Sequence, residues 1–283
     1  YSEICSSIEI ELIPNKNSKG KFINIPENEK EYFHIYFNDS TDEIKNYELV
    51  EDNKVSRIKI IIDHQVKSFK LLLYYCELIE LISFKKFFRN NITDMSSMFE
   101  GCSSLKELNL SNFNTNKVTN MSSMFSGCSS LEELNIFNFI TKNISNMSFM
   151  FSGCSTLSYM NLSNFNTINV INMNSMFFGY SSLKEINLDN FDTKYVTDMS
   201  NMFRGCSALT KLNIAHFSTN FLENINCFFS GCSSLKELNI FELNPHPPTL
   251  FYYYGMFNGF SDELITKMKS KLNEYFFIKE FWL

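Results

Sequence analysis

The stretch "MSSMFEGCSSLKELNL" at residues 95–110 is followed by "MSSMFSGCSSLEELNI" at residues 121–136, so the chain repeats one phrase almost unchanged. The repeat length is 26 residues. A fixed period of roughly 20 to 50 residues indicates a repeat architecture in which each unit packs against its neighbours. The Phe of this phrase recurs at Phe99, Phe125, Phe151, Phe177, Phe203 and Phe229.

The second half of the phrase has the pattern of a strand. Residues 105–113, "LKELNLSNF", place Leu108 and Leu110 two positions apart with polar residues between them. Side chains two positions apart point to the same face of a strand, so this alternation predicts a strand with one buried face.

The first half has the pattern of a short helix. In residues 94–102, "DMSSMFEGC", Asp94 stands where a helix N-cap is preferred and Gly101 where a helix commonly ends. Apolar residues at i, i+3 and i+4 lie on one face of a helix. The residues with this spacing are Met95, Met98 and Phe99.

Together these patterns predict an α/β fold. Stacked repeats are expected to form a solenoid of 26-residue strand-plus-short-helix units, with a parallel sheet on one side and helices on the other. We expect a β-rich cap at residues 1–68, the repeats at residues 69–250, and a degenerate last repeat with a capping helix at residues 251–283. Residues 1–68 contain three strand-like segments, and a separate functional domain there is an alternative.

The repeat pattern resembles a known family. L-x-x-L-N-L-S-N-F-x-T followed by V-T-x-M-S-x-M-F-x-G-C is similar to the BspA-like leucine-rich repeat over roughly residues 69–260. The common leucine-rich repeat has Asn where this chain has Phe113, and the BspA-like class has Phe there. The resemblance implies a leucine-rich-repeat solenoid in a surface or secreted protein of bacteria, mycoplasmas or protists, often implicated in adhesion.

Charge and hydropathy exclude two classes of partner. The net charge is −6 and the pI is about 5.4, and no Lys/Arg run is present that could form a nucleic-acid-binding patch. The most apolar stretch, residues 71–84, is interrupted by Glu77 and Glu80 and is too short to span a bilayer. We therefore expect no nucleic-acid binding and no membrane insertion within this segment.

No catalytic, cofactor or metal motif is found. The chain has no G-x-S-x-G, no phosphate-binding Gly loop and no C-x-x-C, and its four His share no ligand spacing. A non-catalytic protein without cofactors is predicted, and an undetected site in residues 1–68 is the remaining enzyme alternative. The repeated Cys are predicted to be buried, reduced thiols. Cys5 and Cys227 fall outside that row and are better candidates for a disulfide.

The N-x-S/T sequons indicate where a secreted chain would carry glycans. Several arise from the Asn-rich repeat itself and fall in predicted caps or strands. Asn38 and Asn143, which lie in predicted loops, are the best candidates for glycosylation.

A partner-binding face is predicted on the outer surface of the sheet, because repetition fixes the core and leaves only the outer rows free to vary. One outer row is Asn109, Asn135, Asn161, Asn187, Asn213 and Asn239, read as an amide ladder between repeats. The flanking rows are Glu107, Glu133, Tyr159, Glu185, Lys211 and Glu237, and Ser111, Phe137, Ser163, Asp189, Ala215 and Phe241. An aromatic pair within an acidic rim resembles a protein-binding hot spot. The candidate partner-binding residues are therefore Glu133, Phe137, Tyr159 and Glu185.

Three functions follow from this reading. The favoured one is an extracellular or cell-surface adhesion module that binds a protein or glycan on a host, a neighbouring cell or the matrix. The first alternative is a structural subunit that self-assembles into a coat, sheath or filament, with the hydrophobic tail at residues 275–283 as a contact. The second alternative is an intracellular scaffold.

Overall fold

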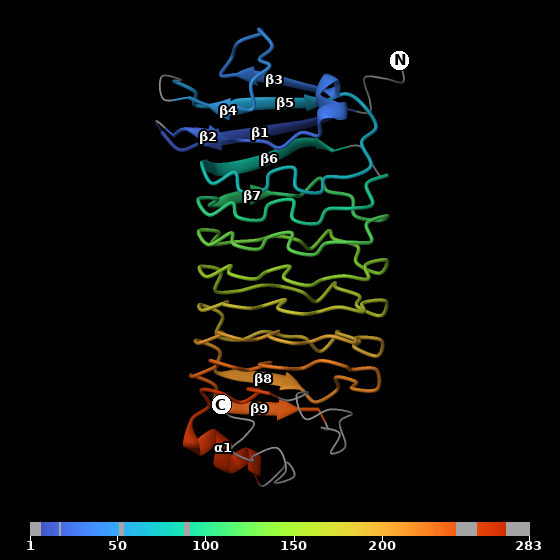
Figure 1. Ribbon diagram of the computed structural model, residues 1–283, viewed down its shortest axis with the longest axis vertical. Coiled ribbons are helices and arrows are strands. Elements are labelled where there is room, and N and C mark those ends of the chain that lie inside the picture. The colour runs from blue at the N-terminus through green and yellow to red at the C-terminus, as the bar shows by residue number, and fades with distance from the viewer. Residues whose placement is uncertain (1–6, 17, 51–53, 88–90, 242–253, 270–283) are drawn as a thin grey trace.

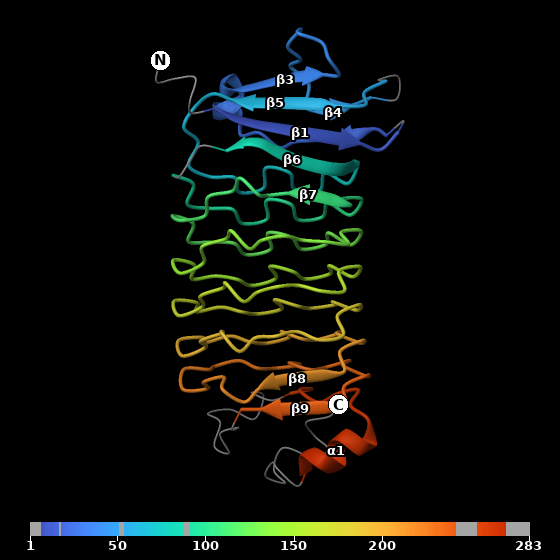
Figure 2. The same cartoon turned by 180° about the vertical axis from the view of Figure 1, so that it is seen from behind.

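A computed structural model describes residues 7–16, 18–50, 54–87, 91–241 and 254–269. The protein is an elongated stack with a β-sheet at the N-terminal end and a helix, α1, at the other (Figures 1 and 2). Between them the chain winds back and forth once for each 26-residue repeat, and we call each such unit a rung.

The N-terminal end is a five-stranded sheet in the order β3-β5-β1-β6-β7. The first three pairings are antiparallel and the pairing of β6 with β7 is parallel. Alternate side chains of β1 are buried, because its Ile and Leu residues occupy every second position. The strands are β1 (Ile8–Pro14), β3 (Phe33–Phe37), β5 (Ile58–Ile62), β6 (Ile79–Phe87) and β7 (Glu107–Asn109).

The remaining elements are short. Strands β2 (Gly20–Lys21) and β4 (Glu48–Leu49) pair with each other, and η2 (Glu27–Tyr32) is a 3-10 helix. Near the C-terminal end, β8 (Lys211–Ile214) and β9 (Glu237–Ile240) form a parallel pair, followed by α1 (Asp262–Lys269).

Each rung has two long sides. We call the side formed by residues 94–101 and their counterparts the turn face, and the side formed by residues 105–111 and their counterparts the sheet face. On the turn face, successive rungs are joined by main-chain hydrogen bonds from the N–H groups of Met95, Ser97 and Phe99 to carbonyls 25 residues later. The same pattern recurs from rung to rung through Asn201 and Phe203.

The predicted fold class, a solenoid of strand-plus-short-helix repeats with a helical cap, is wrong. The described residues contain two helices, η2 and α1, and neither lies within the repeats. Most of the repeat region is irregular, and the five-stranded sheet draws four of its strands from residues 8–87. The predicted capping helix is described only as α1, and residues 270–283 lie outside the described residues.

The turn face is not helical because of its main-chain conformation. The Asp94 carboxylate accepts the Ser96 N–H at 2.8 Å, as an N-cap would. Ser97 then adopts the left-handed region with a φ of 54°, which a right-handed helix does not tolerate. Its N–H therefore points to the next rung and donates to the Ser122 carbonyl at 2.8 Å. The i, i+3, i+4 spacing correctly located buried residues, but it did not imply helical hydrogen bonding.

The core is a continuous row of aromatic rings. The rings of Phe125, Phe151 and Phe177 stack nearly parallel, with centroids 5.7 and 5.9 Å apart. All three side chains are fully buried. Phe241 was predicted to face outward, yet it is buried and stacks on Phe217 at 6.4 Å. The last described rung therefore reaches its core Phe two residues earlier than the 26-residue period expects.

Buried threonines join the rungs on the return path of the chain. The Thr141 hydroxyl accepts the Asn166 N–H at 2.7 Å and donates to the Asn166 carbonyl at 3.0 Å. The threonine hydroxyl therefore makes the two hydrogen bonds that a main-chain N–H and carbonyl would otherwise make between two rungs. The same arrangement occurs at Thr115, Thr167 and Thr193.

Removing one ring from the row should destabilise the whole stack. We expect Phe151→Ala to lower the free energy of unfolding by about 3–5 kcal/mol, since it leaves a cavity between Phe125 and Phe177. Ser111→Ala, at an exposed position of the sheet face, should change it by less than about 0.5 kcal/mol. Urea unfolding followed by circular dichroism measures both, and equal midpoints would contradict the aromatic core.

The buried threonine hydroxyls should matter as well. Thr141→Val keeps the shape of the side chain but leaves the Asn166 N–H and carbonyl without their partner, which should cost about 1–3 kcal/mol of unfolding free energy. Thr119→Val is the matched control. The Thr119 hydroxyl is exposed, so water can replace it as the hydrogen-bond donor to the Thr93 carbonyl. Similar losses of stability in the two variants would show that the buried hydroxyl has no special role.

Candidate binding face

The sheet face carries the two most exposed large apolar side chains among the described residues. Phe137 is 68% exposed and Tyr159 is 72% exposed. They lie on neighbouring rungs, where the flanking Asn135 and Asn161 are also exposed. Most of the described Phe side chains are buried, and Phe149, Phe178 and Phe221 are less exposed than these two rings, which distinguishes this part of the face from the rest.

Both rings line a shallow groove of about 700 Å³. It is lined by Glu133, Phe137 and Tyr159, three of the four predicted partner-binding residues. The fourth, Glu185, lines an adjoining groove of about 620 Å³, which it shares with Tyr159. The grooves therefore meet at Tyr159, and the four predicted residues lie along one continuous depression.

Glu132 also lines the groove and was not predicted. The strand alternation assigned the outer rows to every second residue, and Glu132 stands next to Glu133 outside those rows. One signal was available in the sequence. The equivalent positions in the other 26-residue repeats are Lys106, Ser158, Lys184, Thr210 and Lys236, so among these rungs Glu132 is the acidic member; Glu80, in the strand before them, is the other acidic residue in register.

The asparagine row does not form the predicted amide ladder. The Asn135 side-chain oxygen accepts the N–H of Phe137 at 3.2 Å, within its own rung. Asn161 and Ser163 repeat this arrangement at 3.0 Å. Within the described residues, one amide joins two rungs of this row, from Asn239 to Asn213 at 3.1 Å. The asparagines therefore close local turns, and Asn135 and Asn161 also line the groove.

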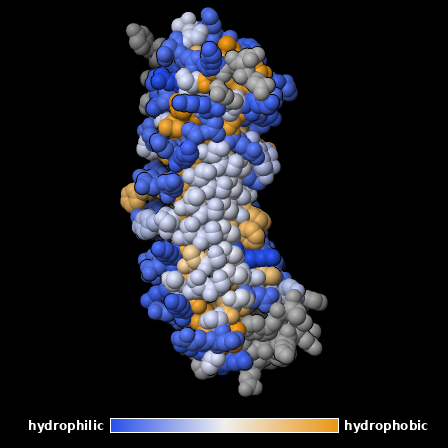
Figure 3. All heavy atoms as spheres, turned by 90° about the vertical axis from the view of Figure 1, so that its left-hand side faces the viewer, coloured by the Kyte–Doolittle hydropathy of each residue, from blue (hydrophilic) through white to orange (hydrophobic). Residues whose placement is uncertain are grey.

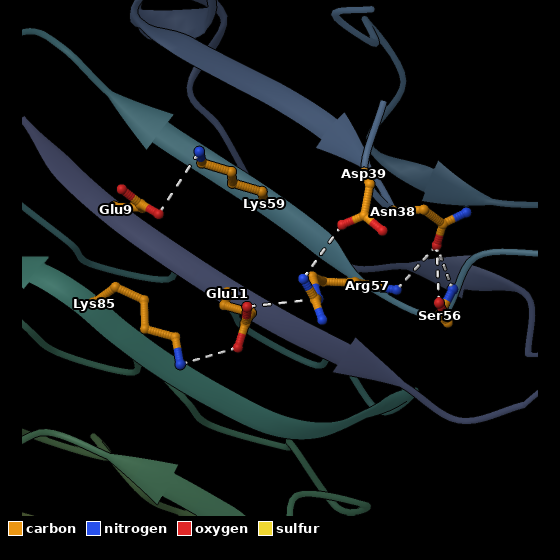
Figure 4. A network of polar contacts seen from close by, with 8 residues as sticks. All are labelled: Glu9, Glu11, Asn38, Asp39, Ser56, Arg57, Lys59 and Lys85. Atoms are coloured by element: carbon orange, nitrogen blue, oxygen red, sulfur yellow. Dashed lines mark hydrogen bonds and ion pairs between the residues drawn. The ribbon is translucent and has the colours of Figure 1, made fainter. Parts of the chain in front are cut away.

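The carboxylates of the groove differ from those of the N-terminal sheet. Glu9 and Glu11 on β1 are held by lysine and arginine side chains from the neighbouring strands (Figure 4). In the described part of the chain, Glu132 and Glu133 form no ion pair, and neither does Glu185. These carboxylates are therefore not in contact with a cation among the described residues, although Lys106 and Lys211 lie near enough to Glu132 and Glu185 for their pKa values to be raised in part by these charges.

One long edge of the stack carries no comparable feature. It appears in Figure 3 as a continuous band of near-neutral hydropathy with hydrophilic surface and isolated hydrophobic residues on either side. Because the surface residues of this edge are alike from rung to rung, they cannot distinguish one rung from another. The sheet face, whose outer residues differ between rungs, is therefore the better candidate for recognition.

The repeated cysteines are buried and reduced. From Cys102 onward each of these thiols donates to a carbonyl of the preceding rung, as Cys128 does to Phe99 at 3.2 Å and Cys154 to Phe125 at 3.1 Å. Burial raises the pKa of Cys154 to about 12. Tyr180 replaces this Cys in one rung, and its buried hydroxyl has no hydrogen-bond partner among the residues that the structure describes. Among the described residues, no group of three His, Cys, Asp or Glu side chains is arranged to hold a metal ion.

Cys227 is the one described cysteine that is only half-buried, and its thiol is free. Cys5, its predicted disulfide partner, lies outside the described residues.

Native thiol reactivity should follow burial. At pH 8 we expect a thiol reagent such as DTNB to label Cys227 and to leave Cys128 and Cys154 unmodified, because burial raises the pKa of both buried thiols and blocks access. Urea should expose the buried thiols together. Peptide mapping after labelling identifies the sites, and rapid native modification of Cys128 or Cys154 would contradict this packing.

The two predicted glycosylation sites are exposed, but their amides are engaged. The Asn143 side chain donates to the Asn116 carbonyl at 2.7 Å. Asn38 donates to the Lys54 carbonyl at 3.2 Å and accepts from Ser56 (Figure 4). Both asparagines thus hold their loops, and a glycan would have to replace these bonds.

These features define the class as a non-globular repeat protein whose varied surface residues gather on one face. Two overlapping segments, residues 68–177 and 153–258, match the family described as "Mycoplasma protein of unknown function, DUF285". Together they cover more than half of the chain, and the chain belongs to this family. Neither the curated proteins nor the solved structures gave a match. No helix among the described residues has the length and apolar character needed to cross a membrane.

Proposed function

We propose that this protein is a non-catalytic binding module, secreted or displayed at a cell surface, that uses its sheet face to hold a protein or glycan on a host, a neighbouring cell or the matrix. The observation that carries this proposal is the exposure of Phe137 and Tyr159 on adjacent rungs, within a groove bordered by Glu133.

The physical basis is the cost of leaving these rings in water. Exposed aromatic side chains that lie together favour an environment from which water is excluded, and they lose little conformational entropy on binding. A partner that covers them gains apolar contact, while the neighbouring asparagine amides and carboxylates provide polar contacts. Hot spots of protein interfaces have this composition.

The sequence also supports a surface role. The repeat resembles that of BspA-like surface proteins, which is the reason for proposing adhesion rather than another kind of binding. The family to which the chain belongs is described as a mycoplasma family, which agrees with the bacterial and mycoplasmal range of that resemblance.

Binding of the purified, fluorescently labelled protein to cultured animal cells tests the proposal. We expect saturable binding by flow cytometry. The double substitution Phe137→Ala with Tyr159→Ala should weaken it about 30-fold or more, since truncating a hot spot costs about 2 kcal/mol. Stability should hardly change, because both rings are exposed.

The matched control is the turn face. Ser122→Ala with Ser148→Ala should leave cell binding unchanged. Normal binding by the aromatic variant, together with loss of binding in the turn-face variant, would show that the interface lies on the turn face and would contradict the proposal.

A second candidate function is that of a self-assembling structural subunit. A specific observation favours it, because a further set of apolar side chains is exposed on the return loops between the sheet face and the turn face. The rings of Tyr195 and Phe221 touch there, with centroids 5.8 Å apart. Analytical ultracentrifugation of the wild type and of Phe221→Ala would reveal it as concentration-dependent assembly that the substitution reduces.

A further inference from the structure

The described rungs that line the groove are not joined to each other by main-chain hydrogen bonds on this face. Within the part of the chain that the structure describes, the N–H groups of residues 132–136 and 158–162 donate no hydrogen bond. Rungs on either side do pair on this face, since Lys106 donates to the Glu80 carbonyl at 2.8 Å and Thr210 to the Lys184 carbonyl at 3.0 Å. The sheet face is therefore open over its middle rungs.

The turn face of the same rungs stays closed. Met121 donates to the Asn146 carbonyl at 3.2 Å, and Phe125 to the Met150 carbonyl at 3.0 Å. The open sheet face is thus a local feature of a stack that is held together elsewhere, and it coincides with the groove that contains Phe137 and Tyr159.

The extent of the groove favours an extended polypeptide as occupant. Phe137 and Tyr159 stand at repeat positions four residues apart along the strand direction, and both line the groove. An extended segment advances about 3.3 Å per residue and can therefore contact both rings. Pockets for successive side chains provide specificity in such recognition.

The charge of the face selects a basic segment. Between Lys106, which pairs with Glu80 at 2.9 Å, and Lys211, which pairs with Glu237 at 3.0 Å, the grooves are lined by carboxylates without an ion pair among the described residues. These carboxylates belong to Glu107, Glu132, Glu133, Glu185 and Asp189. The adjoining grooves are also lined by Lys85, Lys106 and Lys211. The groove that contains Phe137 and Tyr159 is lined by Glu132 and Glu133 and by no Lys or Arg among the described residues, so negative charge is in excess there.

The aromatic pair fits the same occupant. The face of an aromatic ring attracts a Lys or Arg side chain electrostatically, and its edge contacts the apolar stem of that side chain. Glu133 occupies the same repeat position as Tyr159 on the neighbouring rung, so a cation on the Tyr159 ring would meet a carboxylate as well as aromatic surface.

We propose that the sheet face binds an extended, basic polypeptide segment, with a Lys or Arg side chain seated on the Tyr159 ring against Glu133 and a neighbouring residue of the segment against Phe137. This inference rests on the proposed function and names the chemistry of its partner. A glycan would also use the rings, but it would gain little from the excess of carboxylates.

Fluorescence anisotropy with a defined probe tests the inference. The probe is a fluorescein-labelled ten-residue peptide of alternating Lys and Ser, and its matched comparison replaces every Lys by Gln. We expect the full-length protein to bind the Lys peptide at least about 10-fold more tightly than the Gln peptide, with an affinity that falls as salt is raised.

Two groove variants and one control locate the binding. Glu132→Gln with Glu133→Gln, and separately Phe137→Ala with Tyr159→Ala, should each weaken binding of the Lys peptide by about 10-fold or more. Glu48→Gln with Glu77→Gln removes the same charge from exposed sites outside the grooves and should change it less than about twofold. Thermal melts that match the wild type show that each variant is folded.

Three results would overturn the inference. Equal binding of the Gln peptide would remove the requirement for positive charge. An equal loss of binding in the Glu48 and Glu77 control would show attraction to the net charge rather than to the groove. Absence of peptide binding, when cell binding still depends on Phe137 and Tyr159, would reject the basic segment and leave the proposed function standing. The reverse pattern, peptide binding without cell binding, would reject the proposed function instead.

Discussion

The main-chain hydrogen bonds between turn faces are the constraint on which the rest of the structure depends. Alternate N–H groups, such as those of Ser97 and Phe99, donate to the next rung, and this pairing requires the left-handed conformation at Ser97. Because every rung must present its carbonyls at the same place, the repeat length is held at 26 residues through most of the stack. The aromatic row, the buried threonine hydroxyls and the buried thiols then fall into register as a result of that one alignment.

The same alignment explains why one face can be open. With the turn face and the threonine side both joined from rung to rung, the sheet face is not needed to hold the middle rungs together. Phe137 and Tyr159 lie on rungs where main-chain pairing on this face is missing. In these middle rungs the hydrogen bonds that join neighbours therefore lie on other sides than the exposed aromatic rings.

The sequence predicted positions better than it predicted conformation. The period located the buried residues correctly, including Met98 and Phe99, because burial depends on spacing alone. It could not distinguish a helical turn from a left-handed turn bonded to a neighbouring rung, since both bury the same residues. Phe241 was misplaced because the last described rung departs from the period. Glu132 and the unpaired amides of the groove were missed because they depend on how rungs approach one another, which no single repeat records.

Each rung, finally, is an interchangeable structural unit. Each one meets its neighbours through the same carbonyls, rings and hydroxyls, so a whole rung can be duplicated or deleted without designing new contacts at either junction. The outer residues are encoded in the same repeat as the core residues. Recombination between repeats would therefore change the order of aromatic, acidic and neutral rungs along the face while the interior stayed constant. A chain built in this way can diversify its surface at the level of the gene, by exchanging units, much faster than by accumulating single substitutions.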